Sequence, residues 1–376
     1  MPAHREQFDL AVVGAGILGL ACALAAAKRG LRVVVLERNE RARGASVRNF
    51  GFITVTGQDR ETVWLQARRS RDVWRDVAAA AGIPVVQQGL WAAAQRPEAA
   101  AVLESFLRTD MADGCRLLSA ADARRECPGL ATPRLEAVLV SNQEMRVESR
   151  TALPALAHWL ASTYAVSIRW NTAVHAIEWP TVATSHGPVH AAKVIVCPGD
   201  DLVSLFPDRL ARARVGRCKL QMLRLESPGF ALPGTVLSDL SLVRYGGFAK
   251  LPEAQALRQR LSAEQPEYLR YGIHLIVAQS SDGSLVVGDS HDYETAAEPF
   301  ASESIDNLLL DEYRKVTGCA PPAVRERWSG TYAVADDRMV LIEAPAPDVR
   351  LVLVTSGIGA STGFAIGEDV VGELLS

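Results

Sequence analysis

The chain has 376 residues, enough for two domains or one large two-lobed unit that buries a core without disulfide or metal staples. Hydrophobic residues make up 48% and charged residues 22%, an ordinary mixture for a globular protein. The formal net charge of −3 gives no electrostatic reason to expect binding to nucleic acid or to an anionic membrane surface.

The first elements in chain order form a strand, a glycine turn, a helix and a second strand. Residues 10–13 are an apolar run typical of a buried parallel strand, 20–28 predict a helix, and 31–36 predict a second strand. Between the first strand and the helix, Gly14 to Gly19 have the spacing G-x-G-x-x-G. Glu37 closes the second strand 18 residues after Gly19. This order predicts a dinucleotide-binding unit.

Each residue of this unit has a physical task. Gly14 permits a tight turn, Gly16 lets a pyrophosphate approach the backbone, and Gly19 allows close packing of helix and strand. The start of the helix offers free N–H groups to the phosphates. Glu37 has the acceptor oxygens that ribose hydroxyls need.

The uncharged stretch at 10–27 also resembles a membrane span or the core of a signal peptide. Glu6 and Asp9 oppose a signal peptide, and the glycine spacing explains the stretch better. The six cysteines are scattered without metal-ligand spacing, which suits a reducing compartment. We therefore expect a cytoplasmic protein with no metal site.

Further along the chain, periodicity and turn residues predict more helices and strands. Helices are expected at 61–81, 96–114, 119–127 (with Ser119 as its N-cap), 149–164 and 304–316. Strands are expected at 88–93, 166–170, 173–177, 219–225, 272–279 and 284–288, and 192–200 is expected to be a strand that ends in a glycine turn. A turn is expected at 184–189 and a hairpin turn at Asp282-Gly283.

A second glycine loop lies near the end of the chain. Residues 350–355 predict a buried strand, 356–363 form a loop with three glycines, and 364–375 predict a helix. The N–H groups of this loop can hold negative charge on the pyrimidine side of a reduced flavin. Two such strand–loop–helix units favour FAD over NAD. The loop at 43–52 combines small residues, a hydroxyl and Arg48, which suits a pyrophosphate and a flavin ring.

These motifs together resemble the D-amino-acid-oxidase-like superfamily of FAD-dependent oxidoreductases, near glycine oxidase and sarcosine oxidase. The resemblance covers nearly the whole chain. It implies an α/β fold in which a Rossmann-type FAD-binding domain holds an inserted antiparallel-sheet α+β substrate domain. The expected division assigns 6–85, 149–215 and 326–376 to the FAD-binding domain, and 86–148 and 216–325 to the substrate domain. Segments 43–52, 219–224 and 271–277 further resemble a bacterial subgroup linked to aminophosphonate catabolism.

The resemblance also implies roles for individual residues. One group would hold the adenosine diphosphate half of FAD: Gly14, Gly16, Ile17, Leu18, Glu37 and Arg38, with Val174 at the adenine and Gly199 near the pyrophosphate. A second group would line the pyrophosphate and the flavin ring: Ala45, Ser46, Arg48, Asn49, Gly330, Gly357, Ile358, Gly359, Ser361 and Thr362.

Two departures from the family pattern affect the chemistry. Tyr332 stands where related enzymes carry an arginine that grips a substrate carboxylate, and one hydroxyl cannot replace a bidentate guanidinium. A serine, Ser329, stands near the position of the cysteine that bonds flavin covalently in sarcosine oxidase, so we expect non-covalent FAD. The substrate's anionic group then needs another partner. Arg48 is the first candidate, followed by Arg244 with Tyr245 and by His274, and Tyr332 completes the expected substrate-binding set.

The function expected from the sequence is oxidation of the C–N bond of a small anionic amine, with an aminophosphonate or its N-methyl derivative as our hypothesis. Flavin carries the difficult step, so no catalytic side chain is assigned. Oxygen is the expected electron acceptor. The alternatives are an oxidase of glycine, sarcosine or D-amino acids, a flavin amine dehydrogenase with another acceptor, and a non-catalytic FAD-binding subunit.

Overall fold

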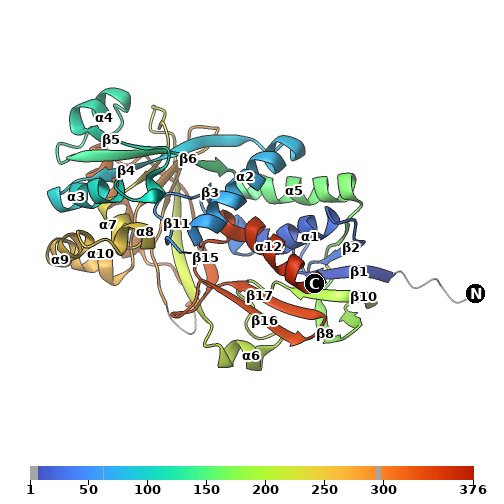
Figure 1. The fold of residues 1–376 in the computed structure, drawn as a ribbon. Coiled ribbons are helices and arrows are strands. Elements are labelled where there is room, and N and C mark those ends of the chain that lie inside the picture. Colours follow the sequence, from blue (N-terminus) through green and yellow to red (C-terminus); the bar gives the residue numbers. More distant parts are fainter. Residues whose placement is uncertain (1–6, 62, 294–297) are drawn as a thin grey trace, which may run out of the picture.

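The structure is a computed structural model that describes residues 7–61, 63–293 and 298–376. Its elements form two lobes, each built around one β-sheet (Figure 1). Within the described residues, the sheet of the first lobe has eight strands: β1 (Gln7–Val13), β2 (Val33–Leu36), β7 (Ser167–Arg169), β8 (Val174–Glu178), β9 (Thr181–Thr184), β10 (Gly187–Val196), β16 (Val340–Ala346) and β17 (Val349–Val354).

The order of strands in this first sheet is β16-β17-β10-β1-β2-β7, and the β8–β9 hairpin pairs with β10. Strands β17, β10, β1, β2 and β7 run parallel to one another. The loops that follow them therefore leave the sheet at the same edge, where open α/β sheets bind their ligands.

Four helices lie on one side of the first sheet: α1 (Ile17–Ala27), α2 (Val63–Ala81), α5 (Ser149–Tyr164) and α12 (Gly359–Leu375) (Figure 1). Helix α1 is apolar on every side, and all its residues are buried, as expected for a helix between a sheet and a second helix layer. Helix α12 packs closely on α1. At their contact, a Cβ added at Gly367 would lie only 2.8 Å from the backbone of Ala21. This contact places the first turns of α1 and α12 at the same edge of the sheet.

The sheet of the second lobe has nine strands in the described part of the chain: β3 (Phe52–Ile53), β4 (Val85–Ala94), β5 (Cys115–Ser119), β6 (Ala137–Val147), β11 (Gly216–Leu225), β12 (Thr235–Leu237), β13 (Ile276–Gln279), β14 (Leu285–Gly288) and β15 (Val324–Val334). The order is β15-β11-β14-β13-β12-β4-β6-β3, with β5 beside β6, and every pair except β12–β4 is antiparallel.

The remaining helices are mostly short: α3 (Pro97–Phe106), α4 (Ala120–Glu126), α6 (Pro207–Arg212), α7 (Asp239–Leu242), α8 (Gly246–Ala249), α9 (Ala254–Glu264), α10 (Pro266–Arg270), α11 (Glu303–Thr317) and the 3₁₀ turns Ala45–Val47 and Asp110–Ala112. The predicted α/β architecture, with a Rossmann-type lobe and an antiparallel lobe, is confirmed. The exact division into five segments stays a prediction, since β3 pairs in the second sheet although it lies within 6–85.

Two local predictions are confirmed in detail. The Ser119 hydroxyl accepts a hydrogen bond from the Asp122 N–H over 3.1 Å, so Ser119 is the N-cap of α4. At the predicted hairpin, Gly283 has φ +81° and the chain turns between β13 and β14.

Several predicted boundaries are wrong. The helix expected at 96–114 ends at Phe106, because Thr109 caps a separate 3₁₀ turn by accepting from the Met111 N–H. The strand expected at 272–279 begins only at Ile276, after a turn in which Gly272 has φ +57°. The turn expected at 184–189 is shorter, since β10 already begins at Gly187.

Two long strands, β6 and β15, had no prediction. Strand β6 contains polar residues that are typical of a loop, yet Glu144 and Arg146 are buried with backbone partners. Glu144 accepts from the Thr56 N–H over 2.7 Å, and Arg146 donates to the Phe50 carbonyl over 2.8 Å. These long-range partners offset the cost of burying charge in a strand, and local pattern cannot reveal them.

Candidate FAD and substrate site

The glycines of the first turn are required by close backbone contacts. Gly14 has φ +101°, and a Cβ there would lie 2.5 Å from the Cys197 carbonyl oxygen. A Cβ at Gly19 would lie 1.9 Å from the Gly14 carbonyl oxygen. Both contacts are too short for any side chain, so β1, α1 and the end of β10 meet only because these residues are glycine.

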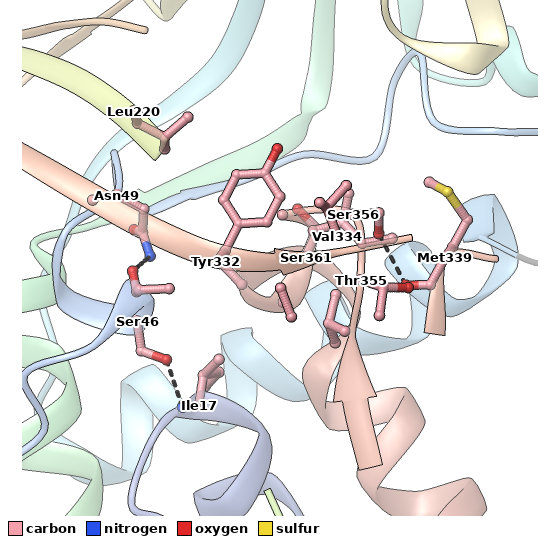
Figure 2. A pocket seen from close by; sticks show the side chains of 18 of the residues that line it. Ile17, Ser46, Asn49, Leu220, Tyr332, Val334, Met339, Thr355, Ser356 and Ser361 are labelled. Carbon is pink, nitrogen blue, oxygen red and sulfur yellow. Dashed lines mark hydrogen bonds between the residues drawn. The ribbon is translucent and has the colours of Figure 1, made fainter. Parts of the chain in front are cut away.

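The first turn of α1 is open to an anion. Gly16 is its N-cap and supplies no side-chain cap, and the turn holds no acidic residue. The Ile17 N–H donates to the Ser46 hydroxyl over 3.0 Å (Figure 2). A Cβ at Gly16 would lie 3.1 Å from the same oxygen. The loop at Ser46 therefore lies directly against the helix start, where N–H groups and the helix dipole favour a phosphate.

Glu37 lies at the end of β2, next to this turn. Its carboxylate is buried and accepts from the Ala15 N–H over 2.9 Å and from the Asn39 N–H over 3.0 Å. These bonds hold the carboxylate in place while it keeps acceptor capacity for hydroxyl groups. The neighbouring Arg38 is half-exposed and forms an ion pair with Asp201.

The second glycine loop lies between β17 and α12. Gly357 has φ +74°, and a Cβ there would lie 3.2 Å from the Tyr332 ring. The Ser361 hydroxyl accepts from the Thr54 N–H over 2.9 Å. The first turn of α12 also holds no acidic residue. Figure 2 shows Tyr332 between the Ser46–Asn49 side and the Ser356–Ser361 side of the site.

A cavity of about 600 Å³ joins these loops to the second lobe. Seventeen predicted residues line it: Gly16, Ile17, Leu18, Ala45, Ser46, Arg48, Asn49, Gly199, Arg244, Tyr245, His274, Gly330, Tyr332, Gly357, Ile358, Gly359 and Ser361. Five predicted residues do not line it: Gly14, Glu37, Arg38, Val174 and Thr362. The Thr362 hydroxyl instead donates to the Ile358 carbonyl within its own helix. Val174 lies in the hairpin strand β8.

The second lobe contributes a cluster of polar and aromatic side chains to this cavity. Arg244 donates to the Tyr293 hydroxyl over 2.6 Å. The His274 ring lies 5.6 Å from that of Tyr245 and 4.9 Å from that of His291, measured between centroids. The His291 ring also lies 6.4 Å from the ring of Tyr332. Segments that are far apart in sequence thus meet at one end of the cavity.

Asp289 lies among these rings and is buried. Its Oδ1 is 3.1 Å from Nε2 of His274, and its Oδ2 is 3.8 Å from Nε2 of His291. Burial raises the pKa of Asp289 to about 7, although the nearby Arg244 charge opposes this rise. Burial, and then the charge of Arg244, hold the pKa of both histidines well below the usual value, so both are neutral at pH 7.

Two cavity residues have pKa values that keep them in one protonation state. Burial raises the pKa of Tyr332 far above that of an exposed phenol, so its hydroxyl stays neutral. Burial lowers the pKa of Arg244, but the neighbouring Tyr293, Tyr332 and Asp289 outweigh that effect and raise it. Arg244 is therefore a permanent cation.

His274, Asp289 and His291 also have the chemistry of metal ligands, because one ligand atom from each lies within 4.8 Å of the others. The Arg244 charge acts on all three residues. It opposes a divalent cation and favours an anion at this end of the cavity.

Arg48, the first candidate for the anion partner, has a different setting. It lies at the border of the cavity, is exposed, and its carbonyl accepts from the Trp328 indole over 3.1 Å. It also lines a second recess with Arg41, Arg43 and Arg150. Arg244 is the better-placed cation of the two.

Sequence reasoning missed Asp289, His291 and Tyr293 as site residues. They follow the end of β14, where 289–293 is a polar run after a buried apolar strand. Polar residues at the end of a buried strand are a signal for a site, and this signal was available in the sequence.

Comparison with known proteins identifies the family. The pattern that defines the family of FAD dependent oxidoreductases (DAO) matches residues 9–372. The chain belongs to this family. The predicted superfamily and its FAD cofactor are thereby confirmed, and the chain is an FAD-dependent oxidoreductase.

Solved structures show the same fold at low sequence identity. Glycine oxidase from Bacillus cereus matches with a TM-score of 0.77 and 16% identity, over 98% of this chain and 95% of that chain. L-proline dehydrogenase from P. horikoshii matches with a TM-score of 0.79 and 18% identity, over 99% and 94%. A curated relative, glycerol-3-phosphate dehydrogenase from Mycobacterium leprae, is 50% identical over 44 residues, which are 12% of this chain and 8% of that protein. This chain thus matches less than a tenth of that relative's length.

The residues present suit FAD. The turn at Gly14–Gly19 has no space for side chains at Gly14 and Gly19, and Glu37 is held at the end of the adjacent strand. The N-cap residues of α1 and α12 supply no side-chain cap. Gly330 leaves space beside the Arg48 backbone, from which a Cβ would be 3.4 Å away. No helix in the described part of the chain has the length and apolar character needed to cross a membrane.

Proposed function

We propose that this protein oxidises the C–N bond of a small amine that carries an anionic group, and that water then hydrolyses the imine product. The observation that carries the proposal is Arg244. Its guanidinium is half-buried, lines the cavity and donates to Tyr293, and among the residues that the structure describes it forms no ion pair with a carboxylate. A cation in this state favours an anionic ligand.

When bound, FAD accepts the hydride equivalent that leaves the carbon next to nitrogen. The chain's own residues position the substrate. Arg244 and the hydroxyls of Tyr293 and Tyr245 bind the anionic group at one end of the cavity. The ring of Tyr332, which packs on Gly357, separates this end from the loop of the second glycine motif. The reacting amine would lie beside Tyr332, where buried side chains exclude bulk water.

An aminophosphonate, or its N-methyl derivative, is the substrate class that we propose. Three features support it. By the family resemblance, Tyr332 stands where related enzymes have the arginine that binds a carboxylate. The guanidinium of Arg244 lines another part of the cavity and can bind an oxyanion there, and the sequence resembles the aminophosphonate-linked subgroup. An ordinary amino acid is the second candidate, supported by the fold that this chain shares with glycine oxidase and L-proline dehydrogenase.

Further parts of the proposal concern the cofactor and the cell. Ser329 near the flavin loop supports non-covalent FAD, and all six cysteines are unpaired, which supports a cytoplasmic location. Oxygen is the proposed electron acceptor, and an amine dehydrogenase with another acceptor is the alternative. A non-catalytic FAD-binding subunit would bind FAD without being reduced by any amine.

The test compares matched substrates on the purified flavoprotein without oxygen. Loss of flavin absorbance is followed after addition of glycine, D-alanine, sarcosine, aminomethylphosphonate and N-methylated aminophosphonates. We expect reduction by a phosphonate at concentrations at which glycine is inert. Faster reduction by glycine or D-alanine would contradict the phosphonate class, and no reduction by any amine would contradict the enzyme. Admission of air then separates an oxidase, which reoxidises at once, from a dehydrogenase. Acid precipitation must release all flavin if it is non-covalent.

A further inference from the structure

When Asp289 is ionised, no proton lies between its buried carboxylate and the ring of His291 beside it. The Nδ1 atom of His291 lies 2.9 Å from the Gly272 carbonyl oxygen, so it carries the proton and donates. The neutral ring then presents the lone pair of Nε2 to Asp289 Oδ2, which lies 3.8 Å away. Two acceptors face each other in a site where only 7% of His291 and 5% of Asp289 are exposed.

His274 does not resolve this conflict. Its Nε2 is 3.1 Å from Asp289 Oδ1, but the two groups are not aligned for a hydrogen bond, and Oδ1 has no hydrogen-bond partner among the described residues. Nδ1 of His274 is likewise buried without a partner in the part of the chain that is described. A buried acceptor without a donor is costly. One added proton would give the Asp289–His291 pair the donor that it lacks.

Burial, and after it the charge of Arg244, keeps the two histidine rings of the cluster without a second proton. The Arg244 charge acts on Asp289 and on both histidines, and it favours the ionised acid and the neutral rings. The other groups that face the cluster are the neutral phenols of Tyr245, Tyr293 and Tyr332, and the thiol of Cys218 behind Tyr332. Asp59 also lines the cavity but is paired with Lys250.

We propose that this cluster takes up about one proton from solvent when an oxyanion binds beside Arg244, so that His291 becomes a second cation of the anion site. The anion compensates the charge of Arg244, which after burial is the second cause that opposes protonation of the rings. The protonated Nε2 of His291 can then donate toward Asp289 or the anion. Two cations beside one acid suit a tetrahedral dianion better than a carboxylate. The inference rests on the proposed function only for the presence of an anionic group on the substrate.

The test counts protons by calorimetry on the FAD-loaded protein. Sulfate is the probe, because it is a tetrahedral dianion with no proton of its own to exchange at pH 8. The binding enthalpy is measured in buffers of different ionisation enthalpy, and the slope gives the protons taken up. We expect a slope of about one, and a Kd for sulfate that rises about tenfold per pH unit above neutrality. Methylphosphonate, inorganic phosphate and acetate then compete for the site.

Three variants locate the proton. In His291→Asn the amide can still donate to the Gly272 carbonyl but cannot take up a proton, and Asp289→Asn removes the acid. We expect both to lose the proton uptake and the pH dependence while they retain FAD. His158→Asn changes an exposed histidine on α5 and should behave like the native protein.

Four results would overturn the inference. They are sulfate binding with no proton uptake, proton uptake that survives in both cluster variants, acetate binding tighter than methylphosphonate, and a stoichiometric divalent metal that a chelator removes from the cluster. Because the native protein alone provides the proton count, the inference can be rejected even if a variant does not fold. Proton-linked sulfate binding without flavin reduction by any amine would reject only the proposed amine oxidation.

Discussion

Replacing Arg244 by methionine tests which cation holds the substrate's anionic group. Methionine keeps the aliphatic part of the side chain but removes the guanidinium group, which donates to Tyr293 and lines the cavity. The matched variant is Arg48→Met, which removes the cation that sequence reasoning placed first and which is exposed at the cavity border. Both variants leave the glycine turns of the FAD site untouched.

The size of the effect follows from burial. A charge-assisted hydrogen bond contributes about 1.5–3 kcal/mol, and loss of one partner of a buried charged pair costs about 2–5 kcal/mol. For the half-buried Arg244 we take about 2–4 kcal/mol, which raises the half-saturating concentration of an anionic amine about 30- to 1000-fold. The exposed Arg48 should change it less than about fivefold, because solvent screens its charge.

The assay is anaerobic flavin reduction over a range of aminomethylphosphonate concentrations, and the flavin spectrum and melting temperature serve as checks of folding. An effect of Arg48→Met larger than that of Arg244→Met would refute the reasoning from burial. Arg244→Lys should fall between the two, since it keeps the charge but loses the bidentate geometry. A native-like response of both methionine variants would place the anion elsewhere.

Three other predictions concern the fold. Asp239→Asn should destabilise the protein by about 1.5–3 kcal/mol in denaturant titration, because the buried Arg96 loses the carboxylate 2.7 Å away and keeps Glu264 as an ionic partner. The same change at the exposed Asp110 should cost about 0–1 kcal/mol. Gly19→Ala should yield protein without bound FAD, measured as the ratio of flavin to protein absorbance, and full occupancy would argue against the close contact at this residue. Because burial raises the pKa of Cys115 to about 11, iodoacetamide should alkylate it slowly at pH 8 and rapidly only above about pH 10, where the thiolate forms; rapid labelling at pH 8 would contradict its burial.

The local parts of the site could be predicted because their cause is local. The turn at Gly14–Gly19, the acid Glu37 and the loop at Gly357 each lie within one strand–loop–helix unit, so spacing and residue type are enough to define them. The contacts of Gly14 and Gly19 agree with the tasks expected of them. The Ser119 cap and the Asp282-Gly283 turn succeeded for the same reason.

The prediction of strands failed where a polar residue is buried by a distant partner. Strand β6 holds Glu144, whose acceptor role depends on the Thr56 backbone 88 residues earlier in the chain. The helix expected at 96–114 failed for a related reason, since its periodicity continues although Thr109 ends it with a competing cap. In both cases the residue pattern is compatible with more than one structure, and a hydrogen bond decides which of them forms.

By itself, the sequence determined the FAD-binding half of this protein, because parallel strands with glycine turns impose their geometry over a few residues. The tertiary structure alone decided the other half. Arg244, His274 and Asp289 come from separate loops of the second sheet, and only the pairing of β12, β13 and β14 brings them together. It also showed that Arg48 is exposed and Arg244 half-buried, and burial sets how strongly a cation attracts an anion.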